Sequence, residues 1–247
     1  MSDRAVRTRS VLDTPSWSSL TGGHAHLARG GDRARAYPAD VSPFAGLADP
    51  ADPEQWTELS ELVGRGAELV VPVVGAVDAP AGWTVVSRMV GVQLVAGPDL
   101  PAPPPGGTAV LVLGPDDVPD MVDLADRTRP GPFVAGTAGL GRFRGVRSGG
   151  RLLAMAGERF RPPGWTEVSA VCTDPAARGR GLAGRLVLAV ASGVLERGDR
   201  PFLHVLGSNT GALRLYRSLG FTDRCEVVFL RLRSPGWDGG APGTGSA

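Results

Sequence analysis

A run of glycine and arginine residues between 171 and 184 carries the clearest chemical signal in the chain. Val171 to Thr173 ends a strand-like apolar stretch, and an amphipathic helix follows from Gly181. The first turn of a helix has backbone N–H groups without intrahelical partners, and the helix dipole adds partial positive charge there. Glycine lets a ligand approach without a Cβ clash, and Arg178 and Arg180 add positive charge. The segment therefore predicts an anion site suited to a pyrophosphate.

Two nucleotide-binding motifs compete for this stretch. Gly179, Gly181 and Gly184 satisfy the G-x-G-x-x-G fingerprint of dinucleotide-binding domains. That fingerprint turns directly out of its strand, and an acidic residue follows about 20 residues later, at the end of the next strand. Here the six residues 174–179 separate strand from helix, and the next strand, 201–206, ends without an acid. The context is unlike that of a dinucleotide site.

The other motif fits its context. Arg178-x-x-Gly181-x-Ala183 resembles the acetyl-CoA signature Q/R-x-x-G-x-G/A of the GNAT superfamily of N-acetyltransferases. A second pattern starts 28 residues after Gly181 and resembles a segment near the end of the same fold: Asn209-x-x-Ala212-x-x-Leu215-Tyr216-x-x-Leu219-Gly220-Phe221. With both patterns in this order, residues 108–233 are identified as similar to a GNAT acetyltransferase, with acetyl-CoA as co-substrate.

The resemblance implies a sheet splayed open between strands 166–173 and 201–206, with the pantetheine arm in the gap. The backbone of Val171 and Thr173 is expected to pair with the pantetheine, and the amides of 179–184 to hold the pyrophosphate. The cofactor-contacting residues that the resemblance implies are Val171, Cys172, Thr173, Arg178, Gly179, Arg180, Gly181, Leu182, Ala183, Gly184, Asn209, Ala212 and Tyr216.

Acetyl transfer to an amine requires removal of a proton from the amine. Glu167 lies eleven residues before Arg178, the spacing that some GNAT enzymes show between their general base and this motif. A carboxylate hydrogen-bonded to a neighbouring strand is the structural alternative. Glu158 is the alternative base or a substrate contact, and Arg159 either lines the acceptor pocket or lies in a solvated loop.

Transfer also requires stabilisation of an oxyanion and a proton for the leaving thiolate. The resemblance places Tyr216 near the coenzyme sulfur as the general acid, against the alternative of an amphipathic core residue with a satisfied hydroxyl. The backbone N–H of Val171 or Cys172 is the candidate oxyanion donor. The Cys172 thiol itself is expected to be structural, because the family transfers acetyl directly.

The three histidines are expected to be structural. His24 and His26 alternate as metal ligands would on a strand, but no cluster of Cys, His or acidic residues joins them, so we predict no metal site. His204 lies on an apolar strand and is expected to be a satisfied core histidine.

Bulk composition sets the class of protein. The 247 residues are 42% hydrophobic and 21% charged, which is typical of a globular chain. A formal charge of +1 predicts no nucleic-acid partner. We also expect no membrane span and no signal peptide. Two cysteines make no disulfide framework, so a cytoplasmic protein is expected. All 26 basic residues are arginine, and isoleucine is absent too, which indicates a GC-rich, bacterial source.

A proline-rich segment divides the chain. Residues 97–107 predict a semi-rigid linker between an N-terminal α/β half, 1–96, and the GNAT domain, 108–233, while 234–247 predict a disordered tail. The N-terminal half has no chemical motif and is of unknown role; it is open to interpretation as a degenerate second copy. Its expected elements are a helix at 53–62 and strands at 69–74 and 83–95, the last with a break near Gly91.

After the linker, the expected strands are 108–113, 142–147, 151–156, 166–173, 201–206 and 221–232, and the expected helices are 116–127, 181–197 and 209–219. The predicted fold class is therefore α/β, a GNAT-type mixed and splayed sheet with helices on both faces, preceded by a smaller α/β half.

Two functions are compatible with these patterns. The first is an N-acetyltransferase whose acceptor, an amine of a small molecule, amino acid or protein, attacks acetyl-CoA directly in a ternary complex. The alternative is a catalytically weak acyl-CoA-binding sensor or scaffold. A homodimer is compatible with either.

Overall fold

The computed structural model describes residues 10–75 and 77–236; most of the predicted tail, 234–247, lies outside the described residues. The helices are α1 (Pro15–Thr21), α2 (Pro53–Val63), α3 (Val118–Thr128), α4 (Leu182–Glu196) and α5 (Thr210–Ser218). The strands are β1 (Arg29–Gly30), β2 (Ala34–Ala36), β3 (Ala45–Leu47), β4 (Glu68–Val73), β5 (Thr84–Ala96), β6 (Leu111–Leu113), β7 (Phe143–Ser148), β8 (Arg151–Glu158), β9 (Trp165–Thr173), β10 (Arg200–Leu206) and β11 (Phe221–Arg233).

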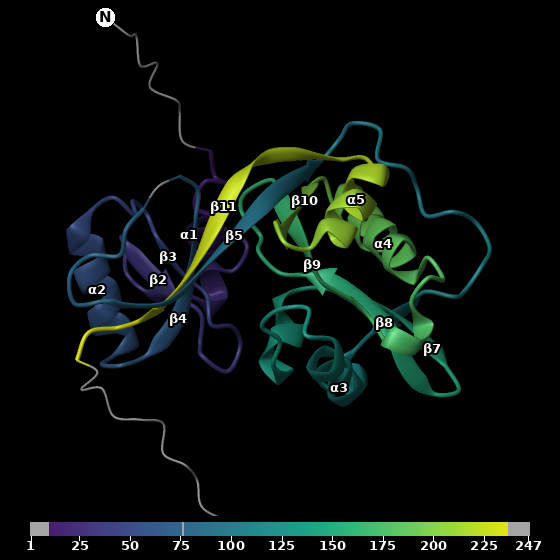
Figure 1. Ribbon diagram of the computed structural model, residues 1–247, viewed down its shortest axis with the longest axis horizontal. Helices are drawn as coiled ribbons and strands as arrows, with labels where there is room; N and C mark the ends of the chain where they lie inside the picture. The colour runs from purple at the N-terminus through teal and green to yellow at the C-terminus, as the bar shows by residue number, and fades with distance from the viewer. Residues whose placement is uncertain (1–9, 76, 237–247) are drawn as a thin grey trace, which may run out of the picture.

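Eight strands form one mixed sheet in the order β4-β11-β5-β10-β9-β8-β7-β6 (Figure 1). β9 and β10 are parallel, and the pairs on either side of them are antiparallel. A separate three-stranded sheet, β1-β2-β3, lies in the N-terminal part. The mixed α/β architecture expected from the sequence, with an additional small N-terminal sheet, is confirmed. Among the described helices, none is long and apolar enough to cross a bilayer.

The two faces of the sheet bury different helices. On one face, Ala154 and Ala156 of β8 pack in a core with Leu186 of α4. On the other, Met155 of β8 packs in a core with Leu124 of α3. Successive side chains of a strand point to opposite faces, so this alternation places α4 and α3 on opposite sides of the sheet. The predicted positions of both helices on the two faces are therefore correct.

One local expectation is wrong. Strand β5 runs through Gly91 without a break. A Cβ at Gly91 would lie 2.7 Å from the Val205 carbonyl oxygen, so the glycine permits close approach of β10 and does not interrupt the strand. His24 immediately precedes the 3-10 turn Ala25–Leu27, and His26 lies within it, so their alternation is not that of a strand.

The N-terminal and C-terminal segments share the large sheet. β5 lies between β10 and β11, and it is antiparallel to β11 over their full lengths, from Thr84 opposite Arg233 to Ala96 opposite Phe221. Residues 97–107 therefore connect two strands that belong to the same sheet. Leu100 of this connection packs against the core beneath α4. The interpretation of residues 1–96 as a degenerate copy stays a prediction.

Candidate functional site

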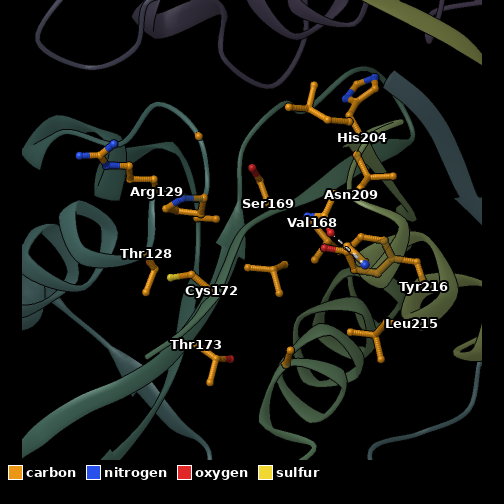
Figure 2. Close-up of a pocket in the computed structure, with 18 of the residues that line it drawn as sticks. Thr128, Arg129, Val168, Ser169, Cys172, Thr173, His204, Asn209, Leu215 and Tyr216 are labelled. Carbon is orange, nitrogen blue, oxygen red and sulfur yellow. Dashed lines mark hydrogen bonds between the residues drawn. The ribbon is translucent and has the colours of Figure 1, made fainter. Parts of the chain in front are cut away.

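A cleft opens where β9 and β10 part. In the described chain the two strands are in register at three positions only, from Trp165 opposite Arg200 to Glu167 opposite Phe202. Beyond them a cavity of about 670 Å³ lies between β9 on one side and the start of α4 and α5 on the other (Figure 2). The splay between these strands, which the family resemblance implies, is present.

One end of the cleft is formed by the turn that leads into α4. Gly179 and Gly181 have φ values of 76° and 71°, a left-handed conformation that favours glycine. A Cβ at either position would meet nothing within 4 Å, so the space beside them is open. Arg178 and the segment 181–184 also line the cleft, but exposed Arg180 is not among the described lining residues. The free N–H groups of the first turn of α4 are therefore available to an anion.

The β9 wall of the cleft contains a bulge. Ala170 has φ 50°, and the register with β8 shifts so that Ala170 and Val171 together face Ala156. The bulge turns backbone groups of β9 out of the ladder, and the other edge of β9 lacks a strand partner in the described chain after Glu167. The Thr173 Oγ1 is buried beside the cleft without a hydrogen-bond partner among the described residues. This wall can therefore pair with an extended ligand.

Helix α5 forms the facing wall. Asn209 lines the cleft at the N-terminus of α5, where its Oδ1 accepts a hydrogen bond of 3.1 Å from the Ala212 N–H. Tyr216 projects toward β9 from the same helix (Figure 2). Its side chain is mostly buried, and burial raises the pKa of the phenol to about 12. Tyr216 therefore keeps its proton at neutral pH.

The opposite end of the cleft is apolar. Phe44, Val70, Met89 and Phe229 line it, and they come from the N-terminal part and from β11. We call these four residues the apolar end wall. The Arg159 guanidinium lies 4.8 Å from the ring centre of Phe44, so its charged group stacks on this wall.

The apolar end wall was not expected from the sequence. Its four side chains come together because β11 pairs with β5 on one edge and with β4 on the other, and Phe44 is bridged to Val70 of β4. The loop Thr128–Pro132 also lines the cleft, and it belongs to an unpatterned segment from which the acceptor cannot be read.

Glu167 lies beneath the cleft and does not line it. Its carboxylate is completely buried and accepts two hydrogen bonds from Arg159, at 2.8 and 2.6 Å. His204 Nδ1 lies 2.7 Å from Glu167 Oε1. Burial alone would raise the pKa of Glu167, but the charge of Arg159 and the hydrogen bonds from Arg159 and His204 outweigh it and lower the pKa to about 2. The predicted general-base role stays a prediction, and this geometry argues against direct proton abstraction.

The tautomer of His204 follows from its neighbours. Arg224 donates to Gln93 Oε1 at 2.7 Å, so the Gln93 amide nitrogen faces the other way. That nitrogen donates to the Leu12 carbonyl and lies 2.9 Å from His204 Nε2. The Nε2 atom must therefore accept a hydrogen bond, and Nδ1–H donates to Glu167. Both ring nitrogens of His204 are therefore satisfied, as expected, but the buried imidazole also lines the cleft.

The remaining candidate residues do not all line the cleft. Arg159 lines the cleft. Glu158 is also buried, but its carboxylate accepts a hydrogen bond of 2.5 Å from Arg197 and is absent from the described lining. Cys172 lines the cleft as a buried strand residue, and burial raises the pKa of its thiol to about 11. Such a thiol is a poor nucleophile at neutral pH. The described residues hold no group of three or more His, Cys, Asp or Glu side chains that could bind a metal.

Comparisons with known proteins agree with this geometry. The FR47-like protein family matches residues 143–230. An acetyltransferase assigned to the GNAT family from Novosphingobium aromaticivorans DSM 12444 is 39% identical, with a TM-score of 0.83 over 93% of this chain and 100% of that one. A GCN5-related N-acetyltransferase from Kribbella flavida, at 21% identity, shares the fold with a TM-score of 0.64 over 91% of this chain and 96% of its own.

Two curated relatives match shorter stretches. N-alpha-acetyltransferase RimI from Mycobacterium tuberculosis (strain ATCC 25618 / H37Rv) is 42% identical over 82 residues, 32% of this chain. A mycothiol acetyltransferase from Thermobispora bispora is 49% identical over 57 residues, 23% of this chain. The matches span 51% of the first relative and 19% of the second, so they concern a part of each protein.

Proposed function

The chain belongs to the GNAT family of acetyltransferases, and on this premise we propose that it transfers an acetyl group from acetyl-CoA to a primary amine by direct attack in a ternary complex. The observation that carries the proposal is the cleft between β9 and β10 with an anion-binding helix start at one end and an apolar end wall at the other. A cofactor and an acceptor can enter such a cleft from opposite ends. The proposal includes the cytoplasmic location expected from the sequence.

The residues present fit acetyl-CoA. The amides from Gly179 to Gly184 would hold the pyrophosphate, because the left-handed glycines leave open space in front of the first turn of α4. The free backbone edge of β9 at Val171 and Thr173 would hydrogen-bond the pantetheine, and the unpartnered Thr173 hydroxyl offers a further donor. Asn209 and Ala212 would contact it from α5. Arg180 is exposed and does not line the cleft, so it would contribute only a long-range attraction to the phosphates.

Three chemical tasks remain for the protein. The bulge at Ala170 interrupts the pairing of β9 with β8, and the N–H of Val171 or Cys172 would stabilise the oxyanion that forms as the amine nitrogen bonds to the acetyl carbon. The C–S bond then breaks, and the Tyr216 hydroxyl would donate its proton to the departing thiolate. A phenol with a pKa of about 12 holds that proton until the thiolate forms.

The proton of the amine would leave to water. Glu167 is fully engaged with Arg159 and His204, so we assign it a positioning role: it fixes the guanidinium against Phe44 and the imidazole at the closed end of the cleft. Glu158, the other candidate, is held by Arg197. An acceptor that is already partly neutral at physiological pH needs no stronger base.

The engagement of Glu167 is also the observation that favours the second candidate, a catalytically weak acyl-CoA-binding sensor or scaffold. Two measurements separate the candidates. Titration calorimetry with acetyl-CoA tests binding, and release of coenzyme A across a panel of small amines, amino acid amides and peptides tests transfer. We expect binding and amine-dependent release. Binding with release no faster than the uncatalysed reaction in every case would favour the sensor.

A further inference from the structure

Half of strand β5 has an open edge. β10 pairs with β5 from Val95 back to Gly91, and the Gly207 N–H donates to the Val90 carbonyl at 3.0 Å. Within the described residues, no strand continues this pairing from Arg88 down to Thr84, although β11 pairs with the other edge throughout. Figure 1 shows the long strands β5 and β11 running side by side.

The open edge is also exposed and apolar. Val85, Val86, Met89 and Val90 are among the large hydrophobic side chains most exposed to solvent, and Leu206 at the end of β10 is exposed beside them. An exposed, flat, apolar strand edge promotes pairing with another chain. Natural proteins often cover such an edge or interrupt it with charge, and here Arg88 is the one charged residue between Thr84 and Val90.

The direction of the free backbone groups follows from the β10 pairing. In an antiparallel ladder, alternate residues point both N–H and C=O to the same neighbour. The Val90 carbonyl points to the β10 side, so the N–H and C=O of Arg88, two residues away, point to that side too. The N–H and C=O of Arg88 therefore point to the β10 side of β5, at a level that lies beyond the end of β10. The Arg88 backbone is therefore the next pairing position for an added strand.

This edge leads directly into the cleft. Met89 belongs to both the open edge and the apolar end wall, and Leu206 lines the cleft as well. A chain that continued the line of β10 would be antiparallel to β5, with its N-terminus beside Val90 and its later residues toward Thr84. Its first side chain would contact the apolar end wall.

Resting on the proposed function, we propose that the acceptor is a peptide that adds to the open edge of β5 as an extra antiparallel strand and presents its α-amino group, on an apolar first residue, to the cleft. Strand addition gives affinity through main-chain hydrogen bonds, and the end pocket gives specificity for the first side chain. The open edge from Met89 to Thr84 accommodates a peptide of about six residues.

The state of Glu167 agrees with an α-amino group. Its carboxylate is held by Arg159 and His204, and both ring nitrogens of His204, which itself lines the cleft, are hydrogen-bonded. No free carboxylate or imidazole therefore faces the acceptor within the described lining. An α-amino group has a pKa of about 7.7–8.0 and is roughly one-third neutral at pH 7.5, whereas a lysine side chain, at about 10.4, is roughly one-thousandth neutral. An α-amino group can therefore react without a general base, and the cleft does not supply one.

The first experiment is a length series of peptides that begin with leucine: the amino acid amide, a tripeptide, a hexapeptide and a nonapeptide. We expect kcat/KM to rise about tenfold or more from the amide to the hexapeptide and then to level off, because the edge ends at Thr84. Two N-methylated hexapeptides should be compared, one methylated at the odd-numbered backbone amides and one at the even-numbered amides. Methylation of the amides that face β5 should remove most of the gain in kcat/KM, and methylation of the amides that face away should remove little of it. Equal kcat/KM for the amide and the hexapeptide would overturn the proposal.

The second experiment compares Arg88→Pro with Arg88→Ala. Both lose the side chain and its ion pair with Asp78, but only the proline loses the N–H that faces the open edge. We expect Arg88→Pro to lower the ratio of kcat/KM for the hexapeptide to that for the amide about tenfold relative to Arg88→Ala. Equal ratios in two variants with native circular dichroism spectra contradict strand addition. If Arg88→Pro does not fold, the N-methylated peptides decide the question on the unaltered protein.

The outcomes for the two proposals are distinct. Transfer to the amide and to small amines without any advantage of peptides overturns strand addition and leaves the acetyltransferase function intact. Failure of every amine to release coenzyme A, although acetyl-CoA binds, overturns both. A hexapeptide that begins with aspartate or lysine should react at least about tenfold more slowly than the leucine peptide, and equal rates would contradict the role of the apolar end wall.

Discussion

Glu167 of β9 lies opposite Phe202 of β10, and the two strands part immediately beyond this pair. The carboxylate at this position is tied to Arg159 on one side and to His204 on the other, so the closed end of the cleft is bound together by buried polar groups. A change at Glu167 acts on the shape of the cleft and on the stability of the fold at the same time. The two effects can be measured separately.

Glu167→Gln should destabilise the protein by about 3 kcal/mol or more, because it leaves the buried guanidinium of Arg159 without its counter-charge. The loss of kcat/KM should be the same from pH 6 to 9, because a carboxyl group with a pKa of about 2 does not titrate in this range. Urea unfolding and pH–rate profiles measure the two quantities.

Glu158→Gln is the matched control, since it breaks the buried pair with Arg197 outside the cleft. It should lower stability and leave the KM for the acceptor nearly unchanged. A Glu167→Gln defect that shrinks as pH rises would instead show direct general-base catalysis, and the positioning role would be wrong.

Tyr216→Phe should lower kcat at least about 10²-fold while acetyl-CoA still binds, because the variant keeps the ring and loses the proton for the thiolate. The hydroxyl has no hydrogen-bond partner among the described residues, so stability should change by no more than about 1 kcal/mol. Single-turnover kinetics and calorimetry provide the measurements. Reduced affinity with unchanged turnover of the bound complex would assign Tyr216 a structural role.

Gly181→Asp and Gly181→Asn form a matched pair at the start of α4. Both residues tolerate the left-handed conformation better than other non-glycine residues, and a Cβ at this position has open space. The carboxylate adds a negative charge where the pyrophosphate is expected. We expect Asp to weaken acetyl-CoA binding about 10²–10³-fold relative to Asn, from a repulsion of a few kcal/mol. Equal affinities of the two variants, by calorimetry, would remove the pyrophosphate from this turn.

Stability should fall as pH falls from 6.5 toward 4 because of His24. Burial is the main cause that lowers the pKa of this imidazole from 6.5 to about 4, against a hydrogen bond of 2.8 Å to the Leu140 carbonyl. Between these two values the unfolded chain binds a proton that the folded chain does not bind. The stability is complete above pH 6.5 and decreases by roughly 3 kcal/mol by pH 4.

His24→Gln should flatten this pH dependence of the free energy of unfolding between pH 6.5 and 4.5. His26→Gln is the control, because His26 is exposed. The measurement is denaturant unfolding at half-unit pH intervals. A slope that survives in His24→Gln would assign the dependence to other groups.

A fragment that begins at Pro105 should not fold alone, because it lacks β5, which lies between β10 and β11. We expect no cooperative thermal transition for 105–247, and recovery of a transition and of acetyl-CoA binding when 1–104 is co-expressed. Differential scanning calorimetry tests both. A cooperative transition and acetyl-CoA binding by the isolated fragment would show that the C-terminal strands close without β5.

The sequence predicted the elements after residue 108 well because each carries its own local signal. The spacing of Leu182, Leu186, Val190 and Val194 predicted the buried face of α4, and all four are buried. The glycines before α4 predicted its start to within a residue. Local periodicity is sufficient for such elements because one helix face or one strand is enough to produce it.

The apolar end wall and the partners of Glu167 could not be predicted in this way. Met89 reaches the cleft on a strand whose partner is 140 residues away, as in the pair of Met89 with Phe229. Phe44 is bridged to Val70 of β4, and β4 in turn pairs with β11 at the other end of the sequence. The sequence around an apolar residue does not show which distant strand it will pair with. Glu167 was identified by its spacing from Arg178, but spacing does not show whether a carboxylate is free or held by an arginine.

The position of β5 has a consequence for the order of events during synthesis. β5 is made early, yet its partners β10 and β11 are made last, so both of its edges stay unpaired while more than a hundred further residues leave the ribosome. Pairings of such long range are slow to form, and unpaired apolar strands promote aggregation in the meantime. The yield of native protein should therefore depend on translation rate and on chaperones that hold an extended apolar segment until the C-terminus is released.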